Sequence, residues 1–469
     1  TIVTDFKYGF ISGALNETYT EGKVEQRNYS LIIDKLLTNR FLGFPIFILF
    51  MWLMFQTTFS LGNYPMEWIE WSTNKLSELL RTILPIGMLK DLLIDGVVGG
   101  VGGVIVFLPN ILILFFFISF MEDSGYMARA SFIMDRIMHK MGLHGKSFIP
   151  MLMGFGCGVP AIMATRTLEN RKDRILTMLA IPFMSCSARL PVYVLLISAF
   201  FTKNQGLILI SIYLIGILMA VLTTLLVKKL ILKGEDAPFV MELPPYRIPT
   251  LKNTTIHMWH KAVQYLKKMG TVILLASIII WALGYFPQNI DYSTDYDKQI
   301  ENIKTDFTLN ASVKNEKIAE IDFLQKSEKM EKSYIGQLGH FVEPIIRPLG
   351  FDWKIGVSLI TGLAAKEVVV STMGVLYQTN DDEDGNVGLQ KKLKEQTFTS
   401  GDRIGEKVFN PLVAYTLMIF ILLYFPCVAA IAAIRKEANL KWAIFVVFYT
   451  TSLAWLVSLI VYQVGNLFL

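Results

Sequence analysis

The sequence is poor in the residues on which several classes of protein depend. It holds three cysteines and five histidines in 469 residues, and 18% of its residues are charged. The cysteines lie in apolar segments and form no CxxC pair, which argues against a disulfide framework. The net charge of +5 is small and dispersed, so nucleic acid is not an expected partner.

A nucleotide-binding loop and a signal peptide are also missing. The tripeptide GKS at 145–147 resembles the end of a Walker A loop, but Lys140 stands where that loop needs a glycine. Residues 1–40 lack the basic start and apolar middle of a signal peptide, and the first residue is Thr1. We therefore expect a chain without its own nucleotide site, from which an N-terminal part has been removed.

Apolar residues are abundant, at 53% of the total, and they form long runs with little or no charge. About 20 apolar residues are enough to cross a bilayer as a helix. This composition predicts an all-α polytopic membrane protein that lies in a lipid bilayer. The runs are 41–60, 97–120, 147–165, 175–202, 206–227, 269–286, 355–377, 409–434 and 442–469.

The third of these runs is interrupted at its centre. Gly154, Gly156 and Gly158 loosen a helix there, and Pro160 removes an amide donor. Transporters place binding sites at such irregular backbone, which protein or a water-filled cavity must surround. We predict a broken helix or a re-entrant hairpin with Cys157 at the break. The alternative is a kinked helix in which Cys157 is a small buried hydrophobe.

Two parts of the chain resemble each other. Residues 135–163 align without a gap on residues 343–371, at an offset of 208, and this alignment pairs Gly154 with Gly362. Internal repeats of this kind are a common plan of transporters, with the site at the interface of the repeats. The sequence therefore predicts two gate repeats.

The alignment resumes farther along the chain. Residues 182–188 resemble residues 423–429 at an offset of 241, so Cys186 and Cys427 are repeat mates. The larger offset reflects a polar insertion around 380–399. Each repeat is thus expected to contribute a thiol from the same place in its fold.

Short basic loops predict the orientation of the repeats. The loops at 124–146 and 166–174 flank the interrupted run, and the positive-inside rule places both in the cytoplasm. The basic segments at 228–268 and 435–441 then also lie inside, and the two repeats become inverted, as alternating access requires. The polar stretches that would lie outside are 287–334 and 378–408.

These patterns divide the chain into six parts. We expect a cytoplasmic N-terminal linker or surface helix at 1–40, a first transmembrane helix with an interfacial amphipathic helix at 41–96, gate repeat 1 at 97–202, a connecting helix and cytoplasmic loop at 203–268, gate repeat 2 with polar external insertions at 269–434, and a C-terminal transmembrane helix at 435–469.

Five stretches of the sequence carry a family resemblance. They are EDSGYMAR at 122–129, GKSFIP at 145–150, GFGCGVPAIMATRTLENRKDR at 154–174, PFMSCSARLP at 182–191 and GLAAKEVVVSTMGVLY at 362–377. Together they resemble the membrane part of the bacterial ferrous iron transport protein B (FeoB) family, from about Asp34 to the C-terminus.

The resemblance implies an importer of ferrous iron in the bacterial inner membrane, with Fe²⁺ as the transported substrate. It implies two gate regions similar to those of concentrative nucleoside transporters. It also implies an N-terminal GTPase domain, which binds GTP and Mg²⁺ and is absent from this chain, and a small soluble partner, ferrous iron transport protein A. The chain itself is then a permease without a cofactor rather than an enzyme, and a homo-oligomer remains open.

For an iron importer, the ligand-type residues in apolar segments become candidate metal ligands. Ferrous iron accepts thiolate, imidazole and carboxylate ligands, and geometry must select it against other metals. The candidates for the central pathway are Cys157, Cys186, Cys427 and Glu367. Glu122 and Asp123, at the cytoplasmic end of a span, would receive iron on exit or mark the boundary of the membrane.

Two cations within apolar segments are expected to support the gates. Charges inside a membrane are costly and therefore suggest function. Lys366 would pair with Glu367, either beside the pathway or as a structural pair in the hairpin. Arg189 would cap the carboxyl end of a broken helix or pair with Glu122 or Asp123, and a structural role is favoured.

Two other functions compete with iron import. A sodium-coupled carrier of the nucleoside type would place polar residues at the hairpin tips, whereas this chain places Cys157 and its repeat mate Ala365 there. A membrane redox or thiol sensor would need exposed thiols of low pKa with a resolving partner. Buried and widely spaced thiols fit that function poorly.

Overall fold

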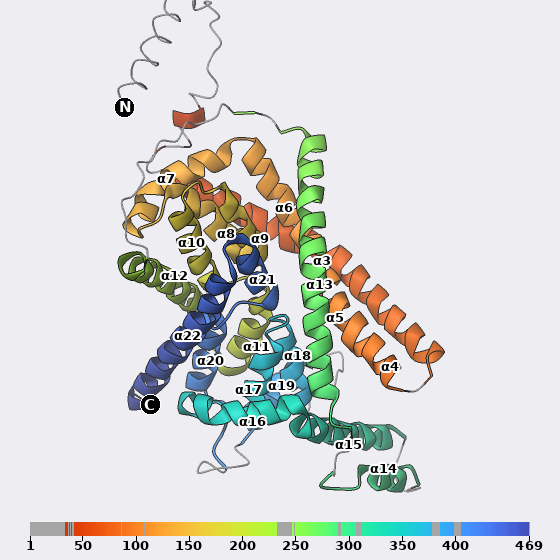
Figure 1. The fold of residues 1–469 in the computed structure, drawn as a ribbon. Coiled ribbons are helices and arrows are strands. Elements are labelled where there is room, and N and C mark those ends of the chain that lie inside the picture. Colours follow the sequence, from red (N-terminus) through yellow and green to blue (C-terminus); the bar gives the residue numbers. More distant parts are fainter. Residues whose placement is uncertain are drawn as a thin grey trace, which may run out of the picture.

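The computed structural model describes residues 33–35, 37, 39, 42–85, 87–106, 108–231, 246–247, 249–288, 292–305, 311–377, 385–397 and 405–468. These residues form helices, turns and loops, and their one β-bridge joins Thr397 to Lys407 (Figure 1). The expected all-α fold class is confirmed. Nearly all of the linker predicted at 1–40 lies outside the described residues.

Five helical spans among the described residues are long and apolar enough to cross a membrane, and a bent helix pair raises the number to six. The five are Gly43–Ile83, Arg171–Phe200, Gln205–Leu230, Pro411–Glu437 and Leu440–Leu467, and the bent pair is Leu108–Asp123 with Tyr126–Lys140. Two of the five contain the breaks described below. The protein is therefore a multi-pass membrane protein.

The N-terminal part is a long helical arm that folds back on itself. Helix α3 (Gly43–Ile83) runs through Pro65, so the predicted first span and the start of the amphipathic helix form one element. Prolines are tolerated inside membrane helices, where neighbouring groups satisfy the freed backbone. The helix ends at Leu84, whose extended backbone suits a residue before proline. The chain returns through α4 (Met88–Asp91), the π-helix η1 (Leu92–Val98) and α5 (Gly99–Val106).

Helices α6 (Leu108–Asp123) and α7 (Tyr126–Lys140) meet at a bend of 85°. Gly125 lies in the bend with a φ of +80°, which residues with a side chain rarely adopt. Its carbonyl accepts a hydrogen bond from Nη1 of Arg129, at 3.0 Å. Arg129 is 1% exposed and also binds the carboxylate of Asp34, at 2.9 and 3.2 Å. This hydrogen bond lowers the pKa of Asp34 and attaches the N-terminal linker to α7.

Each gate repeat consists of a helical hairpin and a broken span. In repeat 1 the hairpin is α8 (Phe148–Gly156) with α9 (Gly158–Ala164), and the span is α10 (Arg171–Ala180) with α11 (Leu190–Phe200). In repeat 2 the hairpin is α17 (Trp353–Thr361) with α18 (Val368–Leu376), and the span is α20 (Pro411–Leu423) with α21 (Val428–Glu437). Short turns of 3₁₀-helix connect them at Gly145–Ser147 (η2), Thr165–Thr167 (η3), Ile181–Phe183 (η4), Ser187–Arg189 (η5) and Arg347–Leu349 (η6).

The two repeats are inverted relative to each other. In Figure 1, α10 lies above α11, whereas α20 lies below α21, so the broken spans run in opposite directions. The hairpin of repeat 1 enters from the end that carries α7, which we call the linker end. The hairpin of repeat 2 enters from the opposite end, which we call the insertion end. The predicted inverted repeats are present.

Other helices enclose this centre. They are α12 (Gln205–Leu230), α13 (Leu251–Tyr285) and α22 (Leu440–Phe468), with α14 (Tyr296–Thr305), α15 (Ala311–Lys332), α16 (Tyr334–Ile346) and α19 (Gly385–Glu395) at the insertion end. Helix α20 is buried on all sides, as its uniformly apolar sequence requires. Leu389 and Leu393 of α19 are buried, and Gln390 donates a hydrogen bond to Ser198 of α11 at 2.9 Å. The insertion of repeat 2 therefore packs on repeat 1.

Candidate functional site

Each of the three cysteines lies at a break that immediately precedes a helix. Cys157 has extended backbone between α8 and α9, Cys186 precedes η5 and α11, and Cys427 precedes α21. A helix start carries unpaired N–H groups that can donate hydrogen bonds to a group placed before the helix. The predicted break at Cys157 is present. The three thiols therefore occupy equivalent local positions, each directly before a helix.

Hydrogen bonds hold each broken span against the hairpin of its own repeat. In repeat 1, Oγ of Ser187 donates to the carbonyl of Gly156 at 3.1 Å. In repeat 2, the amide of Val428 donates to the carbonyl of Leu363 at 3.0 Å. Ser187 and Val428 each follow the cysteine of their span directly. Each span thiol is thereby fixed beside a hairpin tip.

Two buried cations cap the carbonyl groups that the breaks leave free. Arg189 is 3% exposed and donates to the carbonyls of Pro182 and Met184, each at 3.2 Å. Lys366, also 3% exposed, donates to the carbonyl of Phe425 at 2.9 Å. At the repeat offset of 241, Phe425 is the mate of Met184. The two cations therefore perform the same task in the two repeats.

The contacts of these two cations bear on the alternatives expected for them. The described residues contain no ion pair between Lys366 and Glu367, because the ammonium instead lies over the ring of Tyr424, 3.4 Å from its centroid. Among the described residues, the hydrogen bonds of Arg189 go to backbone carbonyls, which agrees with the capping alternative rather than with a pair to Glu122 or Asp123.

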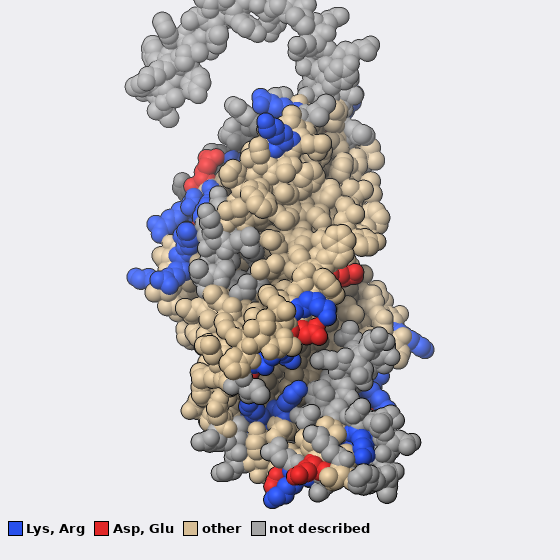
Figure 2. Space-filling view, turned by 90° about the vertical axis from the view of Figure 1, so that its right-hand side faces the viewer, with Lys and Arg blue, Asp and Glu red and all other residues tan. Residues whose placement is uncertain are grey.

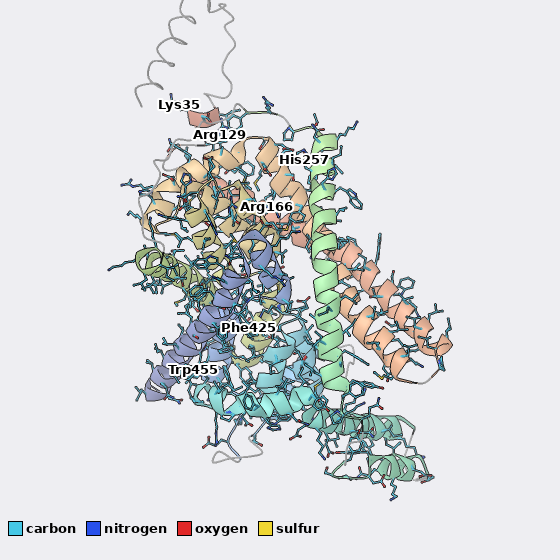
Figure 3. All side chains as sticks on the ribbon, viewed as in Figure 1. Lys35, Arg129, Arg166, His257, Phe425 and Trp455 are labelled. Atoms are coloured by element: carbon cyan, nitrogen blue, oxygen red, sulfur yellow. The ribbon has the colours of Figure 1, made fainter. Side chains whose placement is uncertain are left out.

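The breaks and tips line one cavity of about 130 Å³, which we call the thiol cavity. Cys157, Cys186, Cys427 and Glu367 all contribute to its wall, together with Lys366. Figure 3 places Phe425, two residues before the third thiol, at mid-height of the molecule. Among the described residues, however, no three His, Cys, Asp or Glu side chains are close enough to chelate a metal ion. The arrangement is an open one, in which the candidate ligands share a cavity without converging on one point.

One side of the thiol cavity comes from helices that the sequence reading did not include. Phe55 and Thr58 of α3 and Asn110 of α6 line this side. The amide of Asn110 donates to the sulfur of Met66 at 3.0 Å, and its Oδ1 is buried without a hydrogen-bond partner. A lone asparagine in the apolar run at 97–120 was the available signal.

A second and larger cavity, of about 520 Å³, lies between α6, α7 and the hairpin of repeat 1. We call it the vestibule. Glu122, Lys146 and Arg166 line it together with apolar side chains, whereas the carboxylate of Asp123 accepts a hydrogen bond from Thr254 of α13 at 3.5 Å. Glu122 thus faces a cavity, and its neighbour Asp123 faces a helix.

Both cations of the vestibule are held in ion pairs. Lys146 pairs with Glu169 at 3.0 Å within repeat 1. Arg166, at the end of the hairpin of repeat 1, makes two hydrogen bonds to Glu437 at the end of α21 in repeat 2. These bonds raise the pKa of Arg166. Figure 3 places Arg166 at the linker end, above Phe425. The pair joins the two repeats at that end.

The outer surface is consistent with a bilayer around these cavities. Figure 2 shows Lys and Arg side chains with fewer acidic ones toward the linker end, a broad uncharged area beside and below them, and charges of both signs from mid-height down to the insertion end. Large apolar side chains are exposed on α12, including Leu207, Leu214, Leu218 and Leu226. Exposed leucines in such number suit lipid rather than water.

Inverted repeats whose hairpin tips meet broken spans at a central cavity define a polytopic helical membrane protein of the gate type. Residues 104–200 and 266–441 match the family described as Gate: Nucleoside recognition. Residues 209–261 match the family described as Ferrous iron transport protein B C terminus. No solved structure matches the chain.

Curated relatives extend this match over the whole chain. The Fe(2+) transport protein A/Fe(2+) transporter FeoB fusion protein of Porphyromonas gingivalis is 54% identical over 100% of this chain and 55% of its own length. The Fe(2+) transporter FeoB of Campylobacter jejuni is 43% identical over 95% of this chain and 67% of its own length, and that of Methanocaldococcus jannaschii is 37% identical over 99% and 63%. The chain belongs to the ferrous iron transport protein B family. It spans about half the length of the P. gingivalis relative.

Proposed function

We propose that the chain is the membrane-spanning permease part of a ferrous iron importer, and that Fe²⁺ passes through the thiol cavity. The observation that carries this proposal is the meeting of three helix-start thiols and one carboxylate in a single cavity between inverted repeats. Cys157, Cys186, Cys427 and Glu367 are the proposed ligands. They act on an ion in transit and catalyse no reaction.

The open arrangement of these groups suits transport better than storage. Borderline Fe²⁺ accepts thiolates and carboxylates, and binding requires that the thiols lose their protons. A pathway must bind its ion strongly enough to admit it and weakly enough to release it. Ligands that share a cavity without forming a closed chelate meet that requirement, because a small movement of one hairpin completes or opens the site.

The size of the thiol cavity and the residues at its hairpin tips argue against the alternative substrates. Pockets for drug-sized ligands usually measure about 300–1,000 Å³, whereas this cavity measures about 130 Å³. The side chains at the hairpin tips are Cys157 and Ala365 rather than the amides and hydroxyls that a nucleoside would need. The thiols are only partly exposed and lie along one cavity, whereas a redox sensor would need accessible thiols.

We propose that the linker end faces the cytoplasm and that the vestibule is the inner exit. Lys and Arg side chains gather at this end, in agreement with the positive-inside rule. Glu122 would receive the ion in the vestibule, where it faces the cavity. Asp123 would instead fix the boundary of the membrane through its hydrogen bond to Thr254.

Two further proposals concern the partners and the location of the protein. The P. gingivalis relative is named as a fusion with Fe(2+) transport protein A, and we propose that the corresponding soluble protein is a partner of this chain. A GTPase domain in the longer protein would bind GTP and Mg²⁺ and control the gates. We place the protein in the bacterial inner membrane, and self-association stays a prediction.

The test is iron uptake by the full-length protein in cells that lack other iron importers. Cys157→Ser, Cys186→Ser and Glu367→Gln should each abolish most uptake of radioactive Fe²⁺ at equal protein levels in the membrane. Glu169→Gln, which removes an exposed carboxylate, serves as the matched control and should leave uptake intact. Unchanged uptake in both cysteine variants would refute the proposed pathway.

A further inference from the structure

The two cavities follow one another along the same pair of helices. On α6, Ile111 and Leu114 line the thiol cavity, and Phe115 and Ile118 line the vestibule. On the hairpin of repeat 1, residues 156–159 line the thiol cavity, and Pro160, Met163 and Ala164 line the vestibule. On both elements, the residues that line the thiol cavity are therefore followed directly by residues that line the vestibule. The cavities are separate in this structure.

An apolar contact between residues that both line the thiol cavity lies where the lining of that cavity gives way to the lining of the vestibule. The side chain of Leu114 packs directly on the backbone of Gly156, next to Cys157. A Cβ built on Gly156 would lie 2.6 Å from Cδ2 of Leu114, closer than carbon atoms can approach. Leu114 is 4% exposed and Phe115 beside it is 3% exposed. The lack of a side chain at Gly156 thus allows Leu114 to pack against the backbone.

An apolar contact at this point stops an ion more effectively than it stops a neutral molecule. A cation that crosses it must lose its water without gaining ligands, and such a constriction gates by excluding water. The carbonyl of Gly156, a polar group at this contact, already accepts a hydrogen bond from Ser187. While Leu114 stays in place, the contact therefore presents mainly apolar atoms to an ion, and its carbonyl already accepts one hydrogen bond.

We propose that Leu114, packed on Gly156, is the inner gate of the pathway. A cation at the thiols enters the vestibule only when Leu114 leaves Gly156. Leu114 is then a positioning residue that touches no metal in the closed state, and it controls access from the linker end to Cys157. The inference rests on the proposed function in one respect, because it takes the cavity beside Cys157 as the place where the ion waits.

Accessibility of Cys157 tests the gate without any measurement of iron. The protein is reconstituted in vesicles, and a membrane-impermeant methanethiosulfonate is applied at the linker end. Labelling is followed by mass spectrometry of the peptide that contains Cys157. Leu114→Ala should raise the labelling rate about tenfold or more, because water then enters the contact. Leu195→Ala, which shortens a leucine of α11 that is 3% exposed and lines neither cavity, should leave the rate unchanged.

A second variant keeps the test valid if the first does not fold. Leu114→Asn retains most of the side-chain volume but can bind water, so it should also accelerate labelling. An unchanged rate in folded Leu114→Ala or Leu114→Asn protein would overturn the proposal, as would an equal rise in Leu195→Ala. If labelling responds as expected but the cysteine variants still take up iron, the gate stands and the proposed function fails.

Discussion

The two gate repeats share a framework but differ in the chemistry that they bring to the centre. In both, a span breaks before a cysteine, and the residue after that cysteine contacts a hairpin tip. At the tips the repeats differ, since repeat 1 presents Cys157 where repeat 2 presents Ala365, followed by Lys366 and Glu367. The two repeats thus have similar backbones but present different side chains to the thiol cavity.

The capping cations show how the same structural task can be met from different positions. Arg189 reaches back to carbonyls within its own broken span. Lys366 reaches across from the hairpin tip to the equivalent carbonyl of the other span. A free carbonyl at membrane depth requires a hydrogen-bond donor. Both repeats meet this requirement, but the donor comes from a different position in each. In repeat 2 the cap and the proposed ligand Glu367 are neighbours in the sequence, which links the shape of the break to the chemistry of the cavity.

Removal of the two caps should separate their contributions most clearly. Arg189→Met leaves the carbonyls of Pro182 and Met184 without this donor and should lower the free energy of unfolding by about 3 kcal/mol or more, because hydrogen bonds to charged groups contribute about 1.5–3 kcal/mol each. Lys366→Met removes one such bond and should cost about half as much. Chemical unfolding in detergent micelles measures both. Equal losses would contradict the difference in bonding.

The pair between Arg166 and Glu437 joins the repeats at the linker end and can be tested by exchange of its charges. Either single reversal, Arg166→Glu or Glu437→Arg, places two like charges together. Because the side chain of Glu437 is 6% exposed, each reversal should lower the free energy of unfolding by about 2 kcal/mol. The double reversal should recover more than half of this loss. The same exchange at Lys146 and Glu169, where the carboxylate is 88% exposed, is the control and should change little. A double reversal no better than the singles would show that the pair does not hold the repeats together.

A substitution in repeat 2 can give both hairpin tips a cysteine at the equivalent position. Ala365→Cys places a thiol at the mate of Cys157 within the thiol cavity. We expect the dissociation constant for Fe²⁺ to fall about tenfold, equivalent to about 1.4 kcal/mol, and turnover to slow because release becomes harder. Anaerobic titration calorimetry and uptake measure the two effects. Tighter binding with faster uptake would contradict the proposal that an open set of ligands favours release of the ion.

The smallest effect is expected at the linker, where the pKa of Asp34 is lowered by its bond to Arg129 from an ordinary value of 3.8. A lowered carboxylate pKa means that the bond stabilises the fold above pH 3.8 and that this stability is lost as the pH falls through the folded-state pKa. Asp34→Asn should therefore cost ~1 kcal/mol at neutral pH. Thermal unfolding across pH measures the difference, which should shrink below pH 3.8. A difference independent of pH would exclude the charge as its cause.

The central fold was predictable where the sequence determines the backbone directly. Glycines and a proline around Cys157 predicted its break, and the repeat alignment predicted that Cys186 and Cys427 take equivalent places in the two repeats. The partner of Lys366 was not predictable, because Phe425 is remote in the sequence and its carbonyl becomes free only when α20 ends there. For the same reason the sequence did not reveal Asn110 or Leu114 as cavity walls. Their roles depend on how α6 packs against the hairpin, and α6 is apolar on all sides.

The account depends most on the claim that Fe²⁺ binds at the thiol cavity. X-ray absorption spectroscopy of the anaerobic protein loaded with one equivalent of Fe²⁺ tests it directly. We predict sulfur atoms in the first coordination shell of the iron, and their loss in the Cys157→Ser/Cys186→Ser variant. A shell of oxygen and nitrogen alone, identical in both proteins, would contradict the account and place the ion elsewhere.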